Sequence, residues 1–515
     1  MKIKHFLPSR ALFRDTWIIA FLILVLIYIL PIWIFKYFPS QDGPSHIYNS
    51  FILKNYNNPE YEFSKYYDIR KAPVPNWASH VFMMLMMYVV PPLVSEKLLL
   101  TGYVILMAFS ALYFVNSVGK GRIPLAFLAF FFIYNYISLM GFYNFSLGFG
   151  MFMLVLGYWW RRFDDFGVKN AVVLGILFLI LYFCHPLPLV MAAFCIGVGA
   201  VVFFRPSKWK QSLFSLVCMI PSGGLTLYYV LTRDTPPVPG AWTLSRLWEY
   251  FTRNESLAFH SESQIILGKI TNVIFLVLLL YSLVRDHVLK ENWRLGLRIS
   301  RKDLIFILCG VFFVIYIKAP DGMSGGGFIK TRLAMFPFMI IIPWFSWNMP
   351  KFLRWILVGV IISLAVIYVV HMSYYHKIIN EEIEVYNSGC DSVERNTVLL
   401  PLCFDYIGKS WRIGVFTHTP GYYGYKRGCI NLINYEAGGT DYFPTIFKPD
   451  FHRPTISEVH TGQANINLNV YKDNIDYVLT WAMVPGSDIE KRVMELYELV
   501  KQNGKLKIFR RKNDG

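Results

Sequence analysis

Long apolar runs alternate with short polar connections along the first 371 residues of the chain. A transmembrane helix needs about 20 apolar residues, and the stretch 17–37 supplies such a run without an acidic residue. Because no small-residue cleavage site follows it, we interpret this run as an uncleaved membrane anchor. Ten further runs lie near 98–117, 123–140, 142–160, 171–184, 187–204, 211–231, 267–284, 304–317, 331–347 and 354–371. The pattern predicts a mostly α-helical, polytopic membrane protein with about eleven transmembrane helices.

The segment 81–94 is a twelfth apolar run, but it has only 14 residues and a Pro-Pro pair near its end. That length is more typical of an interfacial or re-entrant segment. If it does not span and the N-terminus is cytoplasmic, the inner segments hold 20 Lys and Arg residues and the outer loops hold 9. The positive-inside rule therefore favours eleven spans. The short run 304–317 is needed for this alternation, and without it the C-terminal region would move to the inner side.

After about residue 380 the long apolar runs end, and positive and negative charges are balanced. Residues 372–515 hold 17 Lys and Arg residues and 17 Asp and Glu residues. The stretch 486–504 has an acidic start and a glycine stop, which predicts a helix. Short β-prone runs lie at 397–402, 477–481 and 505–511. This region is therefore predicted to be a small α/β domain.

We expect two domains, a transmembrane domain at 1–371 with a large outer loop at 38–96, and an extracytoplasmic α/β domain at 380–515. The protein is 55% hydrophobic and only 16% charged, which is too apolar for an ordinary soluble protein. Because the C-terminal region is balanced in charge, the net charge of +17 resides in the membrane portion. It therefore indicates topology and not nucleic-acid binding. The three C-terminal cysteines leave room for one disulfide in an oxidising compartment.

The loop FPSQDGPSH follows the first apolar run and places an acid, an imidazole and a Gly-Pro pair close together. Proline suits the first turn of a helix, so Pro44 predicts a short helix that begins here. Asp42 stands just ahead of this helix, and His46, four residues on, can share a face with it. In one interpretation Asp42 and His46 are catalytic groups that face a cavity. In the other, Asp42 caps the helix and His46 forms hydrogen bonds at the membrane interface.

Two more outer helix ends carry polar side chains. Asn144, in LMGFYNFSLGFG, interrupts an apolar stretch, either as part of a polar site or within a close-packed helix hairpin. His185, in CHPLPL, ends a helix on the outer side, where it is either structural or part of a site. Both residues are candidates for substrate binding.

The stretch KAPDGMSGGGFIKTRLAMFPF is a glycine-rich outer loop that leads into an apolar run, with Lys330 and Arg332 at the outer end of that run. The two cations could snorkel to lipid headgroups, or Arg332 could bind a phosphate through its planar guanidinium. Trp242 could stack on a sugar ring or belong to an interfacial aromatic belt. An acid, two imidazoles and a cation pair on one face suggest a phosphate-bearing substrate that enters from the lipid.

At these residues the sequence resembles the polytopic glycosyltransferases of the GT-C superfamily, such as the protein mannosyltransferases and the aminoarabinose transferases. In that family a catalytic Asp lies near the start of the large loop after the first span, and interfacial helices follow. Asp42 in QDGPSH and the segment 81–94 look similar, and the D-x-x-x-H form resembles uncharacterised bacterial members most. A late Arg at the outer start of a span contacts the lipid phosphate in such enzymes, and Arg332 in KTRLAMFPF is similar. Gly43 stands where the family commonly has a second acid, so the resemblance does not imply a strict metal role.

The resemblance implies an inverting transfer of a sugar from a polyprenyl-phosphate donor to an acceptor hydroxyl, on the outer face of the plasma (inner) membrane of a cell. Asp42 would be the base with His46 beside it, and the acceptor would be a glycan, a lipid or a protein. The resemblance implies a lipid-linked sugar donor as the one co-reactant, and it is compatible with a divalent metal ion. The substrate-binding residues would be Asn144, His185, Trp242, Lys330 and Arg332.

Two other classes stay open: a polymerase or ligase of lipid-linked glycans, and a flippase or transporter of an envelope polysaccharide pathway. No Asp or Glu falls within the eleven apolar runs, which disfavours ion-coupled transport. A polymerase or ligase would be expected to hold its main site in a large loop late in the chain. Here the acid lies in the first loop.

Overall fold

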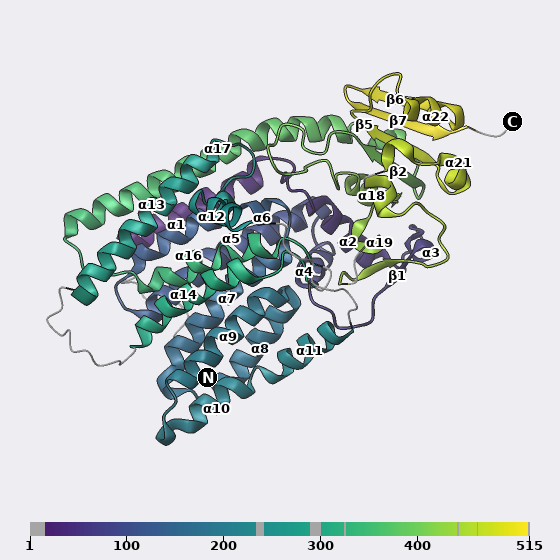
Figure 1. The fold of residues 1–515 in the computed structure, drawn as a ribbon. Helices are drawn as coiled ribbons and strands as arrows, with labels where there is room; N and C mark the ends of the chain where they lie inside the picture. Colours follow the sequence, from purple (N-terminus) through teal and green to yellow (C-terminus); the bar gives the residue numbers. More distant parts are fainter. Residues whose placement is uncertain are drawn as a thin grey trace. The chain divides into compact units, whose positions relative to one another are not determined.

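The computed structural model describes residues 16–232, 242–288, 300–323, 326–439, 442–460 and 462–512. This part of the chain is mostly helical and contains two small sheets (Figure 1). The predicted class, a mostly α protein with a small sheet region near its C-terminus, is therefore confirmed. The chain divides into two compact units. The helical unit comprises Met1–Ile34, Thr101–Ile137 and Phe145–Ser373, and the mixed unit comprises Phe35–Leu100, Ser138–Asn144 and Tyr374–Gly515.

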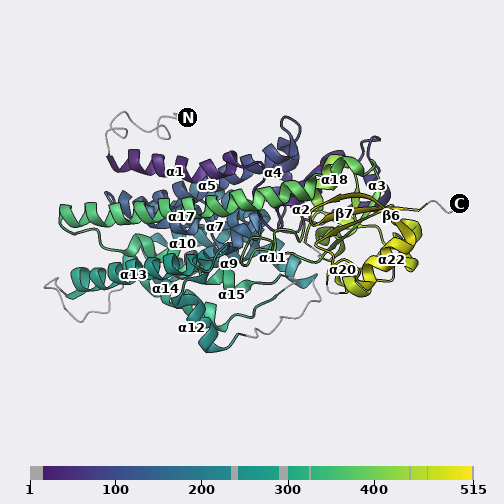
Figure 2. The ribbon, with the colours of Figure 1, turned by 90° about the horizontal axis from the view of Figure 1, so that it is seen from above.

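Five candidate membrane spans lie within the described residues, each long and apolar enough to cross a bilayer. They contain α1 (Thr16–Ile34), α5 (Pro92–Val118), α10 with α11 (Trp209–Val217 and Ile220–Leu231), α13 (Gln264–Leu283) and α17 (Lys351–Asn387). Figure 2 shows α17 as one long unbroken helix. In α1 the exposed face is as apolar as the buried one, since Ile19, Ile23 and Leu26 are all exposed. A helix that is apolar all round suits lipid on its outer side, so these helices indicate a membrane protein.

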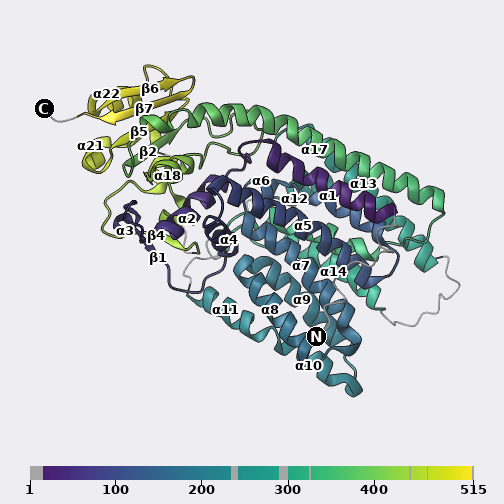
Figure 3. The same ribbon diagram turned by 180° about the vertical axis from the view of Figure 1, so that it is seen from behind.

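Other apolar runs form shorter helices. A 3₁₀ helix (Ile123–Phe132), α8 (Val168–Cys184) and α9 (Pro186–Val202) are each at most 17 residues long. Figure 3 shows α8, α9, α10 and α11 side by side, and α8 packs against both α9 and α11. The run 304–317 lies in α14 (Arg301–Lys318), which begins with a capping box between Ser300 and Asp303. Its 18 residues extend roughly 27 Å, but charged residues at both ends keep it outside the five candidates.

The apolar run 331–347, predicted as one span, is broken. It forms α15 (Ile329–Leu333), α16 (Phe336–Ile341) and a short 3₁₀ helix (Ile342–Trp344). Proline has no N–H and its ring collides with the carbonyl four residues earlier. Pro337 therefore explains why α15 ends at Leu333. α16 packs against α14.

A second break follows the 3₁₀ helix at 123–132, and buried side chains hydrogen-bond the carbonyls that it leaves without helical partners. Tyr103 donates to the Ile133 oxygen at 2.6 Å, and Tyr368 of α17 donates to the Tyr134 oxygen at 2.9 Å. Asn135 donates to the Phe132 oxygen at 2.8 Å. Unpaired backbone groups are costly away from water, so these bonds allow irregular backbone inside an apolar bundle. The other helices between α5 and α16 are α6 (Tyr136–Leu139), α7 (Tyr143–Arg162) and α12 (Leu244–Thr252).

The main sheet of the mixed unit has the strand order β3-β2-β5-β7-β6. Its strands are β2 (Val398–Cys403), β3 (Ile430–Asn431), β5 (Tyr477–Trp481), β6 (Tyr497–Asn503) and β7 (Leu506–Arg511). β2 pairs parallel with β3 and β5, whereas β7 pairs antiparallel with β5 and β6. The runs predicted at 397–402, 477–481 and 505–511 correspond to β2, β5 and β7 and are confirmed. All residues of β2 and β5 are buried, as expected for central strands.

The helix predicted at 486–504 is wrong beyond Leu496. α22 (Asp488–Leu496) begins with Ser487 as its cap and packs against β6 and β7 (Figure 2). The chain then forms β6, which pairs with β7 through a two-residue turn after Asn503. Gly504 adopts φ +54 in that turn, which favours glycine. Pairing with β7 therefore outweighs the local helix signal of this stretch.

Short helices of the first loop belong to the mixed unit together with the C-terminal residues. They are α2 (Gly43–Asn55), α3 (Phe63–Tyr66) and α4 (Ala78–Met86), and the C-terminal region adds α18 (Gly421–Arg427), α19 (Tyr435–Gly438), α20 (Ile456–His460) and α21 (Leu468–Tyr471). β1 (Tyr67–Ile69) pairs antiparallel with β4 (Thr445–Phe447). The segment 81–94 contains the end of α4 and the start of α5, and it forms no helix of its own. The cysteines of the C-terminal region, Cys390, Cys403 and Cys429, are free thiols.

A reciprocal amide pair joins α2 to the C-terminal region. Asn49 donates to the side-chain oxygen of Asn434 at 2.9 Å, and Asn434 donates to that of Asn49 at the same distance. Both side chains are buried. Asn434→Ala removes both hydrogen bonds, while Asn49 keeps Ser45 and Thr445 as partners, so we expect the variant to destabilise the fold by about 1–3 kcal/mol. A lower melting temperature of the detergent-purified protein measures this loss.

The matched control is Asn467→Ala, because Asn467 is exposed and its side chain makes no cap bond to α21. We expect its melting temperature to equal that of the wild type. If both variants have the same melting temperature, the amide pair contributes no stability.

Candidate functional site

The backbone around Asp42 is held by a second segment of the mixed unit. The amide groups of Gln41 and Asp42 donate to the carbonyls of Leu139 and Met140, each at 3.1 Å. Gly141 follows with φ +84, and a Cβ there would lie 2.8 Å from the Asp42 nitrogen. Only glycine combines this backbone conformation with so close an approach. Asp42 is therefore placed by two segments about 100 residues apart in the sequence.

The predicted helix after Asp42 is present, since α2 begins at Gly43 with Pro44 in its first turn. Asp42 occupies the N-cap position, but its side chain makes no cap hydrogen bond. The carboxylate instead accepts from Gln41 at 3.2 Å and lies 3.5 Å from Nε2 of His418. It is 4% exposed. The capping interpretation therefore does not describe this side chain.

The surroundings of Asp42 favour the neutral carboxyl more than water does. Burial raises its pKa to about 6, although the charge of His46 and hydrogen bonds with Gln41 and Tyr435 act in the opposite direction. Glu436 adds to the increase through its negative charge. None of these causes is a lysine or an arginine. Asp42 is thus a buried carboxyl surrounded by imidazole, amide and hydroxyl groups.

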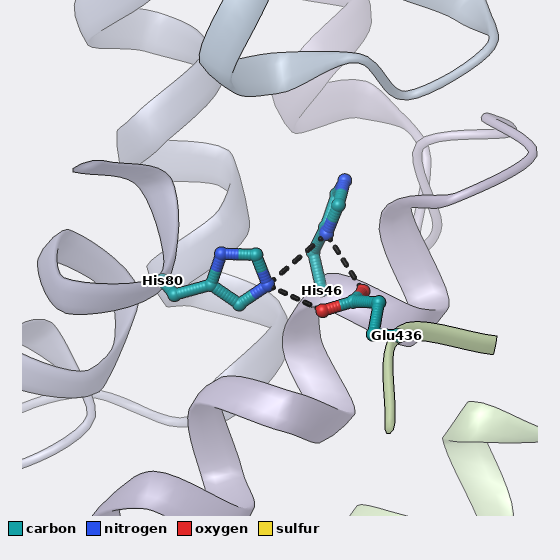
Figure 4. Close-up of side chains that lie close together, drawn as sticks. All are labelled: His46, His80 and Glu436. Carbon is teal, nitrogen blue, oxygen red and sulfur yellow. Dashed lines mark hydrogen bonds and ion pairs between the residues drawn. The ribbon is translucent and has the colours of Figure 1, made fainter. Parts of the chain in front are cut away.

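The side chains of His46, His80 and Glu436 lie together in the core of the mixed unit (Figure 4). Nδ1 of His46 is 2.8 Å from Oε1 of Glu436, and Nε2 of His80 is 2.7 Å from Oε2. The same two ring nitrogens are 3.2 Å apart. The three residues come from α2, α4 and α19, and all are buried. We call them the His-His-Glu cluster.

The outer ring nitrogens of this cluster face the backbone. Nε2 of His46 lies 2.9 Å from the carbonyl oxygen of Gly141. His80 makes a hydrogen bond with the backbone of Asn76. Asn144 supports that backbone, because its amide donates to the Asn76 oxygen and its oxygen accepts from the Ser79 nitrogen, each at 2.8 Å. Asn144, predicted to bind substrate, thus lies where it positions the start of α4.

The three side chains of the cluster are shifted in pKa in different directions. Burial alone would raise the pKa of Glu436, but His80 and His46 hold it well below its usual range. Burial lowers the pKa of His46, yet Glu436 and Asp42 outweigh this effect and the net pKa is raised. Burial also lowers the pKa of His80, and here Glu436 offsets only part of the change. In the absence of another cation, the pattern is one imidazolium beside one carboxylate and a neutral imidazole.

Close packing explains why residue 43 is a glycine. A Cβ at Gly43 would lie 2.3 Å from Oγ of Ser40, 2.5 Å from a carboxylate oxygen of Glu96 and 2.5 Å from the hydroxyl of Tyr143. The Tyr143 hydroxyl donates to Glu96 at 2.6 Å. A second acid directly after Asp42 therefore has no space, because the carboxylate of Glu96 already occupies the adjoining position.

In the helical unit, the structure brings two of the predicted substrate-binding residues together. Nη1 of Arg332 is 3.0 Å from Nε2 of His185. The guanidinium also lies over the ring of Phe145, 5.5 Å from its centroid. Nδ1 of His185 lies 3.0 Å from the Leu187 nitrogen, at the start of α9. His185 therefore both caps a helix and contacts Arg332.

The other two predicted residues of the helical unit have different partners. Lys330 donates to the carbonyl of Ile317 at 2.9 Å. Trp242 stacks with Arg246, whose guanidinium lies 5.4 Å from the centroid of a ring of Trp242. Lys330 thus contacts the end of α14, and Trp242 contacts α12.

Several groups of the site carry no local sequence signal. His46 and His80 are 34 residues apart, and Glu436 follows His80 by 356 residues. His418, which faces Asp42, is equally remote from it. Metal and catalytic motifs are recognised by short fixed spacings, and these residues have none.

The chain matches no model of a known protein family, and no curated protein is significantly similar to it. Its function has to be inferred from the geometry of its own residues.

Gly141→Ala tests the close approach beside Asp42. Alanine at φ +84 is strained, and its Cβ would press on the backbone of Asp42, so we expect a loss of about 1–3 kcal/mol of stability. A lower melting temperature in detergent measures it. The control is Gly102→Ala, because a Cβ at that exposed helical position meets open space. Alanine there should leave the melting temperature unchanged or raise it slightly. Wild-type stability of Gly141→Ala would contradict the packing described here.

Proposed function

We propose that this protein is a membrane glycosyltransferase of the GT-C type. It transfers a sugar from a polyprenyl-phosphate donor to an acceptor hydroxyl at the outer face of the plasma membrane. The observation that carries the proposal is the carboxylate of Asp42. It follows the first candidate span directly, stands at the start of a short helix and makes no cap bond to that helix. A structural acid at this position would be expected to cap the helix.

The organisation of the first loop supports the same function. Between α1 and α5 the chain forms α2, α3 and α4, which are 13, 4 and 9 residues long. These helices are too short to span a bilayer. A large loop of short helices with an acid near its start is the layout that the GT-C resemblance implies.

The proposed reaction is a single displacement at the anomeric carbon of the donor sugar. Asp42 takes the proton of the acceptor hydroxyl while the acceptor oxygen forms a bond to that carbon. The bond from the same carbon to the phosphate oxygen breaks, and polyprenyl phosphate leaves with its electron pair. Base catalysis of this kind contributes roughly 10²–10⁴-fold. Positioning of donor and acceptor supplies much of the rest.

Arg332 is the proposed ligand of the departing phosphate. Its planar guanidinium suits two oxygens of one phosphate, and its contact with His185 fixes the direction of one nitrogen. Lys330 stands two residues earlier and adds a second positive charge to this part of the chain. In this proposal Trp242 binds the sugar ring. Asn144 acts indirectly, through the hydrogen bonds that position the start of α4.

The proposal includes eleven spans, with the region after α17 on the extracytoplasmic side of the membrane. The alternation of Lys and Arg residues supports this arrangement. We expect an externally active reporter fused after Gly515 to be active. We also expect single cysteines placed in 285–302 to be protected from impermeant thiol reagents in intact cells. Labelling of this basic loop from outside would contradict the arrangement.

Asp42→Asn tests whether Asp42 is the base of the proposed reaction. Asparagine is nearly the same size and keeps an oxygen that accepts from Gln41, so we expect expression and melting temperature close to the wild type. Transfer should fall by roughly 10²–10⁴-fold because an amide cannot take the proton. The measurement is the release of polyprenyl phosphate from a labelled lipid-linked sugar.

Asp68→Asn is the matched control, since it makes the same change at an exposed carboxylate of the same loop. It should keep full activity. Full transfer by Asp42→Asn would exclude the base mechanism. If wild-type protein moves the lipid-linked sugar across vesicle membranes without releasing polyprenyl phosphate, it is a flippase.

A further inference from the structure

Hydrogen bonds at the outer nitrogens decide where the protons of the His-His-Glu cluster lie. A carbonyl oxygen only accepts, so Nε2 of His46 must carry the proton that it donates to Gly141 at 2.9 Å. The outer nitrogen of His80, Nδ1, lies 3.4 Å from Oγ of Ser79, a hydroxyl that can either donate or accept. In a neutral imidazole one nitrogen is a donor and the other holds a lone pair. Nδ1 of His46, the inner nitrogen of that ring, is then a lone-pair atom when the ring is neutral.

Nδ1 of His46 and Nε2 of His80 both face one electron-rich group, the carboxylate of Glu436. Figure 4 shows both inner nitrogens directed toward the carboxylate of Glu436 and the other nitrogen of each ring directed away. The nitrogen-to-oxygen distances are 2.8 and 2.7 Å, and the nitrogens are 3.2 Å apart. A neutral His46 would place its lone pair against a carboxylate oxygen of Glu436 with no proton between them. Without a metal ion, each inner nitrogen must therefore carry a proton toward Glu436, which places two N–H groups 3.2 Å apart beside one carboxylate in a buried site.

A divalent cation satisfies all of these atoms together. Two ligands about 2.0–2.1 Å from a tetrahedral zinc ion lie roughly 3.3 Å apart, and the inner nitrogens are 3.2 Å apart. The nitrogen-to-oxygen distances of 2.8 and 2.7 Å are shorter, so the carboxylate of Glu436 would move back by about half an ångström to bind the same ion. Metal-binding histidines commonly donate their other N–H to a backbone carbonyl, which fixes the ring and its tautomer. Nε2 of His46 makes that second hydrogen bond to Gly141, and Nδ1 of His80 lies 3.4 Å from Oγ of Ser79.

We infer that His46, His80 and Glu436 form a binding site for a divalent transition metal of the zinc class. Two imidazoles and one carboxylate are donors that suit zinc better than magnesium, which prefers oxygen ligands. Three protein ligands leave at least one coordination position for water or another group. The site does not depend on the proposed transferase activity, since it rests on the cluster alone.

A metal here would tie three segments of the mixed unit together. His46 lies in α2, His80 in α4 and Glu436 in α19, so one ion would link the first loop to the C-terminal region. A ligand that binds only the folded state stabilises it in proportion to the logarithm of its concentration over its Kd. Metal removal should therefore lower the melting temperature.

The experiment uses the full chain in detergent, stripped with EDTA and then dialysed against zinc followed by metal-free buffer. We expect about one zinc per chain by elemental analysis. Glu436→Gln and His80→Asn should each lower retention at least tenfold. His452→Asn, which removes an exposed histidine outside the cluster, should keep the ion.

Wild-type protein supplies a test that does not depend on folding of the variants. Zinc should raise the melting temperature of the stripped protein, and magnesium at the same concentration should not. X-ray absorption at the zinc edge should show two imidazole ligands at about 2.0 Å. Wild-type protein that retains no zinc and melts equally with and without it would overturn the inference. So would equal zinc retention by wild type and Glu436→Gln.

Discussion

The contact of the buried Glu436 carboxylate with two histidine rings is the interaction on which the mixed unit depends. A carboxylate removed from water is stable only when charges or hydrogen-bond donors replace its hydration. The ring nitrogens that face it belong to His46 and His80, on two helices of the first loop. Removal of one member would leave a buried charge or lone pair without its partner. The first loop and the C-terminal region are therefore coupled through one charged group, which the amide pair of Asn49 and Asn434 supports.

The same physical requirement acts in the helical unit in another form. Apolar surroundings require every backbone carbonyl to have a partner, yet the chain is broken near 133–136 and again after Leu333. At the first break, side chains such as Tyr103 and Tyr368 provide the hydrogen bonds that a continuous helix would have made. Irregular backbone in this unit is thus tolerated because buried hydroxyl and amide groups replace the missing helix bonds.

Asp42 and the His-His-Glu cluster adjoin each other but have different surroundings. α2 carries His46 one turn after Asp42, so a single short helix sets the separation of the proposed base from one cluster residue. Asp42 contacts amide, hydroxyl and imidazole groups, whereas Glu436 lies between two imidazoles. Burial therefore raises the pKa of one carboxyl while the imidazoles lower that of the other. The two buried carboxyl groups thus differ in proton affinity, with Asp42 able to take up a proton at a higher pH than Glu436, which suits them to different tasks.

The sequence by itself determined the features that depend on neighbouring residues. Apolar runs predicted α1 and α17, Pro44 predicted the start of α2, and β-prone runs predicted β2, β5 and β7. It also singled out Asp42 and His46, because both lie in one short loop. Only the tertiary structure decided that residues 497–503 form a strand, since the hydrogen bonds come from β7. It alone brought His80, His418 and Glu436 to the site. The reason is that helix and turn preferences act over a few residues, whereas a buried polar cluster forms between groups that meet only when the chain is folded.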